Sequence, residues 1–316
     1  MPIIISELLH KTTIDPREAE LLLAFVLKKD WPYIIAYAKD KVDSKVAKTF
    51  LSLVQRRKKH EPIAYLTGEQ PFFGRDFLVN RHTLIPRPET EILVELVKHR
   101  TCHMSRVTII DVGTGSGCLA ATLALECPNA KVVASDVSSA ALKVAQQNTE
   151  RLGADVEFVK DDLLGKKLIQ TLTHPLPSLK LREGCRRRGE LCFVANLPYL
   201  PSSDKKTMMP DVAKYEPAKA LFAGRDGSSL VVKLLQQISS LCHSEGVRRV
   251  EESSLTKISP LRRLRSFGRN DRIAVFLEVD PRQTKKLAAL AHQLFPKHNI
   301  LIKQDLCGRE RFLIIV

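Results

Sequence analysis

The amino-acid sequence predicts an α/β protein in which a mostly parallel sheet carries helices on both faces and follows a small helical domain. Two observations lead to this class. From residue 107 onward, short apolar runs alternate with segments of helical periodicity, and alternating units of this length specify a mostly parallel sheet. Before about residue 75, apolar residues instead recur at the spacing of amphipathic helices.

The N-terminal region carries two helix signals. Asp15 suits the N-cap and Pro16 the first helical position of one helix. The apolar stripe expected on this helix consists of Leu21, Leu22, Phe25 and Val26. A second helix is expected over residues 42–54, closed by the basic run 56–59, because cations favour the negative end of a helix.

Glycines and prolines punctuate residues 61–90, where two short apolar runs predict a hairpin, and a helix is expected over 91–98. Beyond it we expect strands at 107–112, 131–136, 156–160, 192–195, 273–278, 299–303 and 312–315, with helices at 117–126 and 138–152. The chain therefore divides into a helical domain over 1–75, a hairpin connector with a linking helix over 76–100, and an α/β domain over 101–316.

Two basic segments near residues 174–190 and 243–272 interrupt the alternation, and we interpret them as insertions into loops. The formal net charge of the chain is +15, which first suggests a nucleic-acid-binding protein. The first segment has five basic and two acidic residues and the second has eight and four, so together they carry 7 of the 15 charges. Nearly half of the excess thus lies away from the motifs below.

The composition of the chain argues against membrane-spanning, secreted, disulfide-rich and metal-binding proteins. No apolar run reaches the about 18 residues of a membrane-spanning helix, and the first ten residues lack the basic start of a secretory signal. The seven cysteines have no CxxC spacing, which argues against a disulfide framework and favours a reducing cytoplasm. His99 and His103 are four residues apart without an evident third ligand, so no metal site is expected.

A glycine-rich turn, Asp111-Val112-Gly113-Thr114-Gly115-Ser116-Gly117, joins an expected strand to a helix. Glycines there allow a tight turn and close approach of a ligand to backbone N–H groups. Asp136 ends the next strand, where a carboxylate can accept from two ribose hydroxyls, and Asp161 and Asp162 follow the third. Three acidic strand ends predict an acidic pocket that repels pyrophosphate and suits the cationic S-adenosylmethionine better than NAD. The alternative is a turn without a ligand.

Asn196-Leu197-Pro198-Tyr199 follows the fourth strand, where ligands bind in such sheets. An amide nitrogen is a poor nucleophile, so a site must hold its N–H groups and aim the nitrogen. The side-chain oxygen of Asn196 and the backbone carbonyl of Leu197 can accept those N–H groups. Pro198 stiffens the loop, and Tyr199 offers a flat wall for a planar group. The alternative is an ordinary loop with a packing tyrosine. Glu278, which ends the fifth strand, is expected to be structural or to support a residue of the site, and not to be a catalytic base.

With these motifs the chain resembles the protein-glutamine methyltransferases that modify peptide chain release factors, the PrmC/HemK family. The resemblance covers most of the chain outside the two insertions. It rests on Gly74 with the following strand, Ile85-Pro86-Arg87-Pro88-Glu89-Thr90-Glu91, residues 111–117, residues 196–199, Tyr215-Glu216-Pro217-Ala218, and Asp305-Leu306-Cys307-Gly308-Arg309-Glu310-Arg311. The Pro-Arg-Pro-Glu-Thr-Glu and Tyr-Glu-Pro-Ala segments are much more specific than the glycine loop.

The resemblance implies a Rossmann-like, seven-stranded class I methyltransferase domain over 101–316, with an N-terminal domain that helps to hold the release factor. The substrate implied is the glutamine of a Gly-Gly-Gln loop, methylated on its amide nitrogen by S-adenosylmethionine. Residues implied in cofactor binding are Asp111, Gly113, Thr114, Gly115, Gly117, Asp136, Asp162, Leu163 and Asn196, with Asp162 or Leu163 near the adenine. Residues implied at the reaction centre are Asn196, Leu197, Pro198 and Tyr199, of which Asn196 and Leu197 hold the glutamine amide.

Two departures from the family pattern are visible. Leu197 stands where the family usually has proline, and Asn-Leu-Pro-Tyr is also the form seen in ribosomal RNA adenine dimethylases. The second insertion displaces the usual Pro-Gly-Gly turn before the fifth strand. Two alternatives therefore stay open: an adenine amino-group methyltransferase acting on RNA or DNA, and an inactive cofactor-binding homologue. We expect a cytoplasmic monomer that acts on release factors without membrane contact and without a need for direct nucleic-acid binding.

Overall fold

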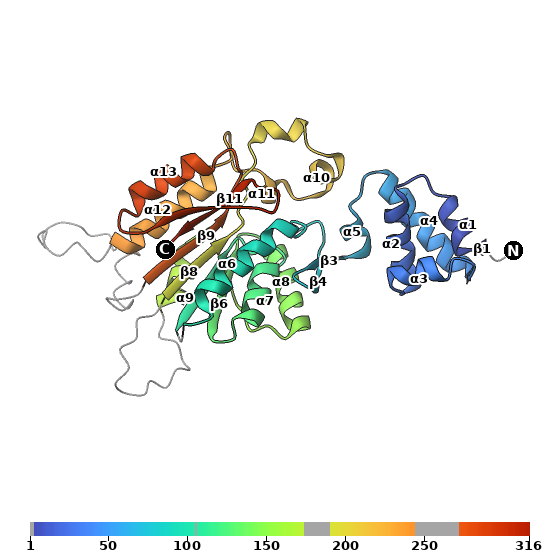
Figure 1. The fold of residues 1–316 in the computed structure, drawn as a ribbon, viewed down its shortest axis with the longest axis horizontal. Helices are drawn as coiled ribbons and strands as arrows, with labels where there is room; N and C mark the ends of the chain where they lie inside the picture. The colour runs from blue at the N-terminus through green and yellow to red at the C-terminus, as the bar shows by residue number, and fades with distance from the viewer. Residues whose placement is uncertain (1–2, 105, 174–189, 244–271) are drawn as a thin grey trace, which may run out of the picture.

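A seven-stranded sheet forms the centre of the C-terminal part of the described chain (Figure 1). The computed structural model describes residues 3–104, 106–173, 190–243 and 272–316. The strand order is β10-β11-β9-β8-β5-β6-β7. In chain order these strands are β5 (Val107–Val112), β6 (Ala130–Asp136), β7 (Glu157–Lys160), β8 (Glu190–Ala195), β9 (Arg272–Glu278), β10 (Ile300–Gln304) and β11 (Glu310–Ile315).

Strands β5 to β9 pair in parallel, and β11 lies antiparallel between β9 and β10. The prediction of a mostly parallel sheet is therefore confirmed, as is the seven-stranded form that the resemblance implied. From β5 the chain moves outward through β6 and β7, then returns to place β8 on the other side of β5. Such a reversal opens a crevice at the carboxyl ends of the two central strands, where ligands bind in α/β sheets.

Apolar clusters cover both faces of the sheet, as the near-continuous hydrophobic runs of its parallel strands require. Ile110 and Val112 pack into one cluster, while Val107 and Ile109 point to the other. Helices α9, α12 and α13 supply side chains to the first cluster, and α6 and α7 to the second. The helices are α6 (Glu91–Thr101), α7 (Cys118–Glu126), α8 (Ser139–Leu152), α9 (Lys166–Thr173), α10 (Pro210–Tyr215), α11 (Ala218–Leu221), α12 (Ser229–His243) and α13 (Thr284–Leu294), with a 3-10 turn η2 (Ser202–Lys206).

A separate set of short helices forms the N-terminal region, as expected (Figure 1). Its elements are β1 (Ile3–Ile4), α1 (Ile5–His10), α2 (Pro16–Leu27), α3 (Trp31–Ala36), β2 (Lys41–Val42), α4 (Ser44–Lys58) and α5 (Ile63–Thr67). The Asp15 carboxylate accepts the N–H groups of Arg17 and Glu18 at 2.9 and 3.2 Å, which confirms the N-cap. The predicted stripe is wrong in part, since Leu21 and Phe25 are exposed. The buried residues of this helix are Ala19, Leu22, Leu23 and Ala24, which face α4.

A hairpin of β3 (Glu69–Phe72) and β4 (Arg75–Leu78) connects the two regions. A hairpin was predicted here, but it begins before residue 76 and so includes residues that the sequence assigned to the helical domain. Phe72 and Phe77 are buried and meet edge to face, with ring centres 6.0 Å apart. Asn148 on α8 fixes the hairpin because its side chain accepts from the Leu78 N–H at 2.7 Å and donates to the Leu78 carbonyl at 3.0 Å. The 3-10 turn η1 (Pro88–Thr90) then leads into α6.

The two basic segments of the sequence lie outside the described residues except at their ends. Glu190 and Arg272, which the sequence reading counted with the insertions, are the first residues of β8 and β9 and pair with each other in register. Glu190 is buried and accepts from the Arg100 guanidinium at 2.9 and 3.0 Å. Among the described helices, none has both the length and the apolar character needed to cross a bilayer.

Candidate functional site

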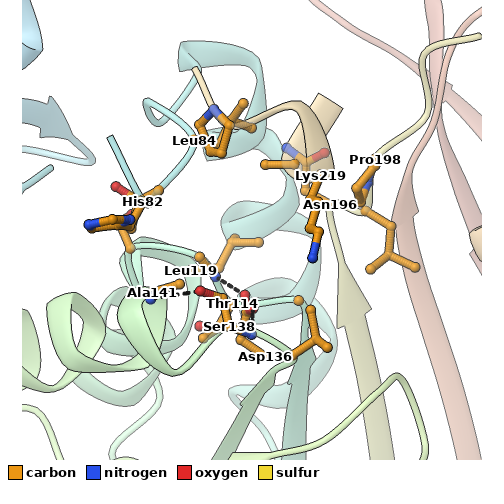
Figure 2. A pocket seen from close by; sticks show the side chains of 18 of the residues that line it. His82, Leu84, Thr114, Leu119, Asp136, Ser138, Ala141, Asn196, Pro198 and Lys219 are labelled. Atoms are coloured by element: carbon orange, nitrogen blue, oxygen red, sulfur yellow. Dashed lines mark hydrogen bonds between the residues drawn. The ribbon is translucent and has the colours of Figure 1, made fainter. Parts of the chain in front are cut away.

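The carboxyl ends of the central strands surround a cavity of about 400 Å³ (Figure 2). It is lined by residues that follow β5, β6, β7 and β8, and by the segment before α6. Figure 2 shows Asp136, Asn196 and Lys219, which come from three separate segments, arranged around it. Of the residues predicted from sequence, those that line this cavity are Gly113, Thr114, Gly115, Asp136, Asp162, Leu163, Asn196, Leu197 and Pro198.

The glycine loop wraps tightly over the end of β5. Gly113, Gly115 and Gly117 all have positive φ, and the N–H groups of Gly113 and Thr114 donate to the Ser135 carbonyl at 2.8 and 2.9 Å. Asp111 and Gly117 are not part of the cavity lining. Asp111 is buried beneath the loop and accepts from the Thr114 hydroxyl at 2.6 Å, and a side chain on Gly117 would collide with Ala145. Both residues therefore shape the loop from behind.

Asp136 is held in place by two backbone N–H groups. Its Oδ2 accepts from Gly115 at 3.0 Å and its Oδ1 accepts from Ser138 at 2.8 Å. Partial burial raises the pKa of this carboxyl, and these two hydrogen bonds oppose that rise. Because an ionised carboxylate has about four acceptor sites, each oxygen keeps one for a ligand. This geometry suits a pair of vicinal hydroxyls.

The end of β7 contributes an apolar and an acidic residue. Leu163 is buried and has a φ of +51°, an uncommon conformation for a side chain of this kind. Backbone strain of this sort clusters at ligand sites, where the surrounding structure holds it. Asp162 is exposed and pairs with Lys233 at 2.7 Å, so its carboxylate is directed at a neighbouring helix. Of the two, Leu163 is the better apolar support for a flat ring.

Asn196 and Leu197 line both this cavity and a second pocket of about 110 Å³. The Asn196 Nδ2 donates to the Thr90 hydroxyl at 2.9 Å, while its Oδ1 is buried without a partner. Leu197 is buried against the glycine loop, and a Cβ added to Gly113 would lie 2.8 Å from its Cδ2. The absence of a side chain at Gly113 therefore makes room for Leu197. An orphaned buried acceptor at the junction of two pockets is a site that needs a donor.

Tyr199 contributes to the smaller pocket and not to the larger cavity. Its hydroxyl donates to Glu278 Oε1 at 3.4 Å, and burial, with the nearby Glu278 charge, raises its pKa. Glu278 is 1% exposed, and burial raises its pKa to about 7. It contacts Thr90 and Tyr199 and is not among the residues that line the cavity.

Two signature segments meet across the cavity. Glu216 of the Tyr-Glu-Pro-Ala segment is buried, pairs with Arg87 of the Pro-Arg-Pro-Glu-Thr-Glu segment, and accepts from the Ile85 N–H at 3.2 Å. Both segments carry the family resemblance, but no role for their residues follows from the sequence alone. The pair joins the two segments beside the cavity, which Arg87 and Pro217 line.

The expected acidic pocket is only partly correct. Arg81, Arg87 and Lys219 also line the cavity, so cations face the acidic strand ends. These residues come from the connector and from α11, far from the β-strand motifs in sequence, and strand-end reasoning could not have found them. A ligand with both cationic and anionic groups fits such a mixed lining better than a simple cation does.

Comparison with known proteins identifies the family. Residues 5–68 match the model of the PrmC N-terminal domain, and residues 88–171 match the methyltransferase small domain. The release factor glutamine methyltransferase of Koribacter versatilis is 39% identical over 227 residues, which cover 72% of this chain and 75% of that protein. The chain belongs to the release factor glutamine methyltransferase family.

More distant members of the release factor glutamine methyltransferase family align over more of the chain. The protein from Bacillus cereus is 26% identical over 317 residues, which cover 98% of this chain and 95% of the relative. Among solved structures, a methyltransferase from Pyrococcus furiosus aligns with 83% of this chain and 97% of its own, with a TM-score of 0.42 and 16% identity.

As a member of the release factor glutamine methyltransferase family, the protein takes S-adenosylmethionine as its cofactor. The cavity fits this molecule. Asp136 has free acceptor sites for the ribose hydroxyls, Leu163 supplies an apolar surface, and the mixed charges suit a ligand with a sulfonium, an amino and a carboxylate group. The volume of about 400 Å³ lies within the range of about 300–1,000 Å³ that is usual for small-ligand sites.

Proposed function

We propose that this protein transfers the methyl group of S-adenosylmethionine to the side-chain amide nitrogen of the glutamine in the Gly-Gly-Gln motif of peptide chain release factors. The observation that carries the proposal is the Asn196 side chain at the junction of the two pockets, whose buried Oδ1 lacks a donor. A glutamine amide supplies such a donor. The names of the relatives and the match to the PrmC N-terminal domain support the same substrate.

In this proposal the chain acts mainly by positioning. Asn196 Oδ1 and the Leu197 backbone carbonyl accept the two N–H groups of the glutamine amide and direct its nitrogen toward the larger cavity. The apolar walls of the smaller pocket, including Pro198 and Tyr199, enclose the flat amide and exclude water. When bound, S-adenosylmethionine would supply an electrophilic methyl group on a cationic sulfur. As the amide nitrogen bonds to the methyl carbon, the sulfur–methyl bond breaks, the neutral thioether leaves, and the methylated amide releases one N–H proton to water, so the residues need not provide a strong base. Asp136 and Leu163 hold the cofactor's nucleoside, with Gly113 and Gly115 beneath it.

The parts of the chain have separate tasks in this proposal. We assign residues 1–75 to release-factor recognition, residues 76–100 to the connector, and residues 101–316 to methyl transfer. We further propose that the enzyme acts as a monomer in the cytoplasm, where translation takes place, and that it needs no direct contact with nucleic acid. The hydroxyl of Tyr215, the last residue of α10, donates to the carbonyl of Lys59 at the C-terminal end of α4 at 3.0 Å, which links α10 to the helices assigned to recognition.

The test is transfer of labelled methyl from S-adenosylmethionine to a purified release-factor domain. We expect label on the Gly-Gly-Gln domain and none on the same domain with alanine in place of that glutamine. We expect Asn196→Ala to abolish transfer while calorimetry still detects cofactor binding, and the exposed Asn129→Ala to behave as the wild type. Label on adenine of RNA or DNA instead would establish the alternative substrate. Cofactor binding without methyl transfer to the Gly-Gly-Gln domain, RNA or DNA would indicate an inactive homologue.

A further inference from the structure

A chain of hydrogen bonds runs from the reaction centre to a buried carboxyl group. Asn196 Nδ2 donates to Thr90 Oγ1 at 2.9 Å, and Thr90 Oγ1 donates to Glu278 Oε2 at 2.7 Å. Thr90 and Glu278 are 3% and 1% exposed, so solvent does not compete for these bonds. We call these three residues the Asn196–Thr90–Glu278 relay. Its middle residue belongs to the Pro-Arg-Pro-Glu-Thr-Glu segment, whose Arg87 pairs with Glu216.

The second oxygen of Glu278 is also surrounded by donors. The Tyr199 hydroxyl donates to Glu278 Oε1 at 3.4 Å, and Arg311 Nη1 lies 3.8 Å from the same oxygen. Glu89 is the acidic side chain that also faces this group. An ionised carboxylate accepts hydrogen bonds and cannot donate them. Above about pH 7, where most molecules have Glu278 ionised, its carboxylate therefore requires the single hydroxyl proton of Thr90.

The direction of the relay follows from that requirement. Once the Thr90 proton is committed to Glu278, the Thr90 oxygen has only lone pairs to offer Asn196. It can accept from the amide nitrogen of Asn196 but cannot donate to the amide oxygen. The reversed amide would place two acceptors against each other and lose the hydrogen bond. The nitrogen of Asn196 is thus assigned to Thr90, and the oxygen is the end left without a partner.

We infer that Thr90 and Glu278 are positioning residues for methyl transfer: they fix the polarity of the Asn196 amide so that its oxygen, and not its nitrogen, is the end that lacks a hydrogen-bond partner and accepts from the substrate amide. This inference rests on the proposed function, in which the acceptor is an amide with two N–H donors. An Asn196 presented the other way would oppose its own N–H groups to those of the substrate. The relay therefore favours a methyl-accepting substrate whose nitrogen carries hydrogen-bond donors.

The relay joins segments that are distant in sequence. Thr90 lies in η1, Asn196 follows β8, Glu278 ends β9 and Arg311 lies on β11, and the first two are 106 residues apart. Arg311 is itself fixed, since its Nε donates to Asp305 Oδ2 at 3.1 Å. Three signature segments of the sequence thus converge behind one amide. One segment supplies Asn196, one supplies Thr90, which bonds to it, and one supplies Arg311, which lies beside Glu278.

The test compares Thr90→Val, which keeps the shape but removes the hydroxyl, with Thr90→Ser, which keeps it. We expect Thr90→Val to lower kcat by about tenfold or more, the effect of losing one hydrogen bond, with cofactor Kd changed less than about twofold. Thr90→Ser should recover most of the rate. The matched control is Thr101→Val, a buried threonine on α6 whose hydroxyl donates to the Val97 carbonyl at 2.8 Å, away from the site. It should lose stability but not rate.

A second measurement does not depend on turnover. The chain has six asparagines, so selective ¹⁵N-asparagine labelling gives a simple spectrum in which Asn196→Asp identifies the side-chain signal of Asn196. In the cofactor-bound wild type we expect one Nδ2 proton of Asn196 to be protected from exchange, and in Thr90→Val we expect that protection to vanish. Exchange that is equally fast in both proteins overturns the relay, as does an undiminished kcat in Thr90→Val. If the wild type methylates no Gly-Gly-Gln domain, the proposed function fails, and the exchange measurement still decides the relay.

Discussion

Replacing Gly113 by alanine tests the contact between the glycine loop and the acceptor loop. Gly113 has a φ of +79°, and a Cβ there would lie 2.8 Å from Leu197 Cδ2. Since carbon atoms pack best at about 3.5–4.0 Å, Leu197 must move by roughly 1 Å. Leu197 is 4% exposed and lines both the larger cavity and the smaller pocket, so its displaced side chain must turn into space that the proposed ligands need. A displacement of this size near the chemistry lowers rates by about 10²-fold.

The positive φ adds a separate cost. An alanine in the left-handed region is strained by about 1–2 kcal/mol whatever its surroundings. Gly68 provides the matched control, because its φ is +81° and nothing lies within 4 Å of its added Cβ. We therefore expect Gly68→Ala to lower the free energy of unfolding by this amount and to leave kcat near that of the wild type. Gly113→Ala should lower both.

The assay is methylation of a Gly-Gly-Gln domain under saturating cofactor, together with denaturant unfolding of each variant. In the double variant Gly113→Ala/Leu197→Ala the colliding methyl is gone while the backbone carbonyl of residue 197 remains. Its kcat should exceed that of Gly113→Ala, although the lost leucine lowers stability further, by about 2–5 kcal/mol. A wild-type kcat in Gly113→Ala, or a double variant no faster than the single one, would refute the reasoning.

Three more predictions follow from the site. Asp136→Asn should weaken cofactor binding by about 10- to 150-fold, the effect of one lost charge-assisted hydrogen bond of about 1.5–3 kcal/mol, measured by calorimetry against the exposed Asp155→Asn; equal affinities would refute the ribose assignment. Burial raises the pKa of Glu278 to about 7. Lowering the pH through this value protonates the Glu278 carboxylate, which can then donate to Thr90 and allow the Asn196 amide to turn over. We therefore expect kcat to fall as the pH falls. Glu278→Gln should lack this acid limb, and a limb that persists in it has another origin. Glu216→Gln should lower the free energy of unfolding by about 1–3 kcal/mol in denaturant titrations, because Arg87 loses its charged partner. An unchanged midpoint would show that the pair does not stabilise the contact between the two segments.

Local signals in the sequence were sufficient where one segment determines the outcome. The Asp15 cap, the alternation of strands and helices, and the glycine turn after β5 depend on neighbouring residues, and the structure has them in the predicted places. The stripe on α2 was harder to predict, because its run of apolar residues offers several possible faces. Packing against α4 selects Leu22 and Leu23 and leaves Phe25 outside.

The site was predictable only in its strand-end half. Asp136 and Asn196 could be found because the carboxyl ends of parallel strands converge in every sheet of this kind. The contribution of Thr90 could not be found in this way, since its partner Glu278 lies 188 residues away and only the closed fold brings them together. The cations Arg81 and Lys219 reach the cavity from segments that have no periodic signal.

The two ends of the central strands differ in how far the length of the adjoining segments can change. Residues 174–189 and 244–271 join it at the amino ends of β8 and β9, whereas Asn196 and Glu278 lie at the carboxyl ends, six or seven residues further along each strand and about 20 Å away. The segments that precede β8 and β9 can therefore gain or lose residues while Asn196 and Glu278 keep their positions at the carboxyl ends of the strands. Insertions at the amino ends of β8 and β9 can therefore accumulate in evolution without altering the site. The same positions suit the insertion of a reporter or an affinity tag.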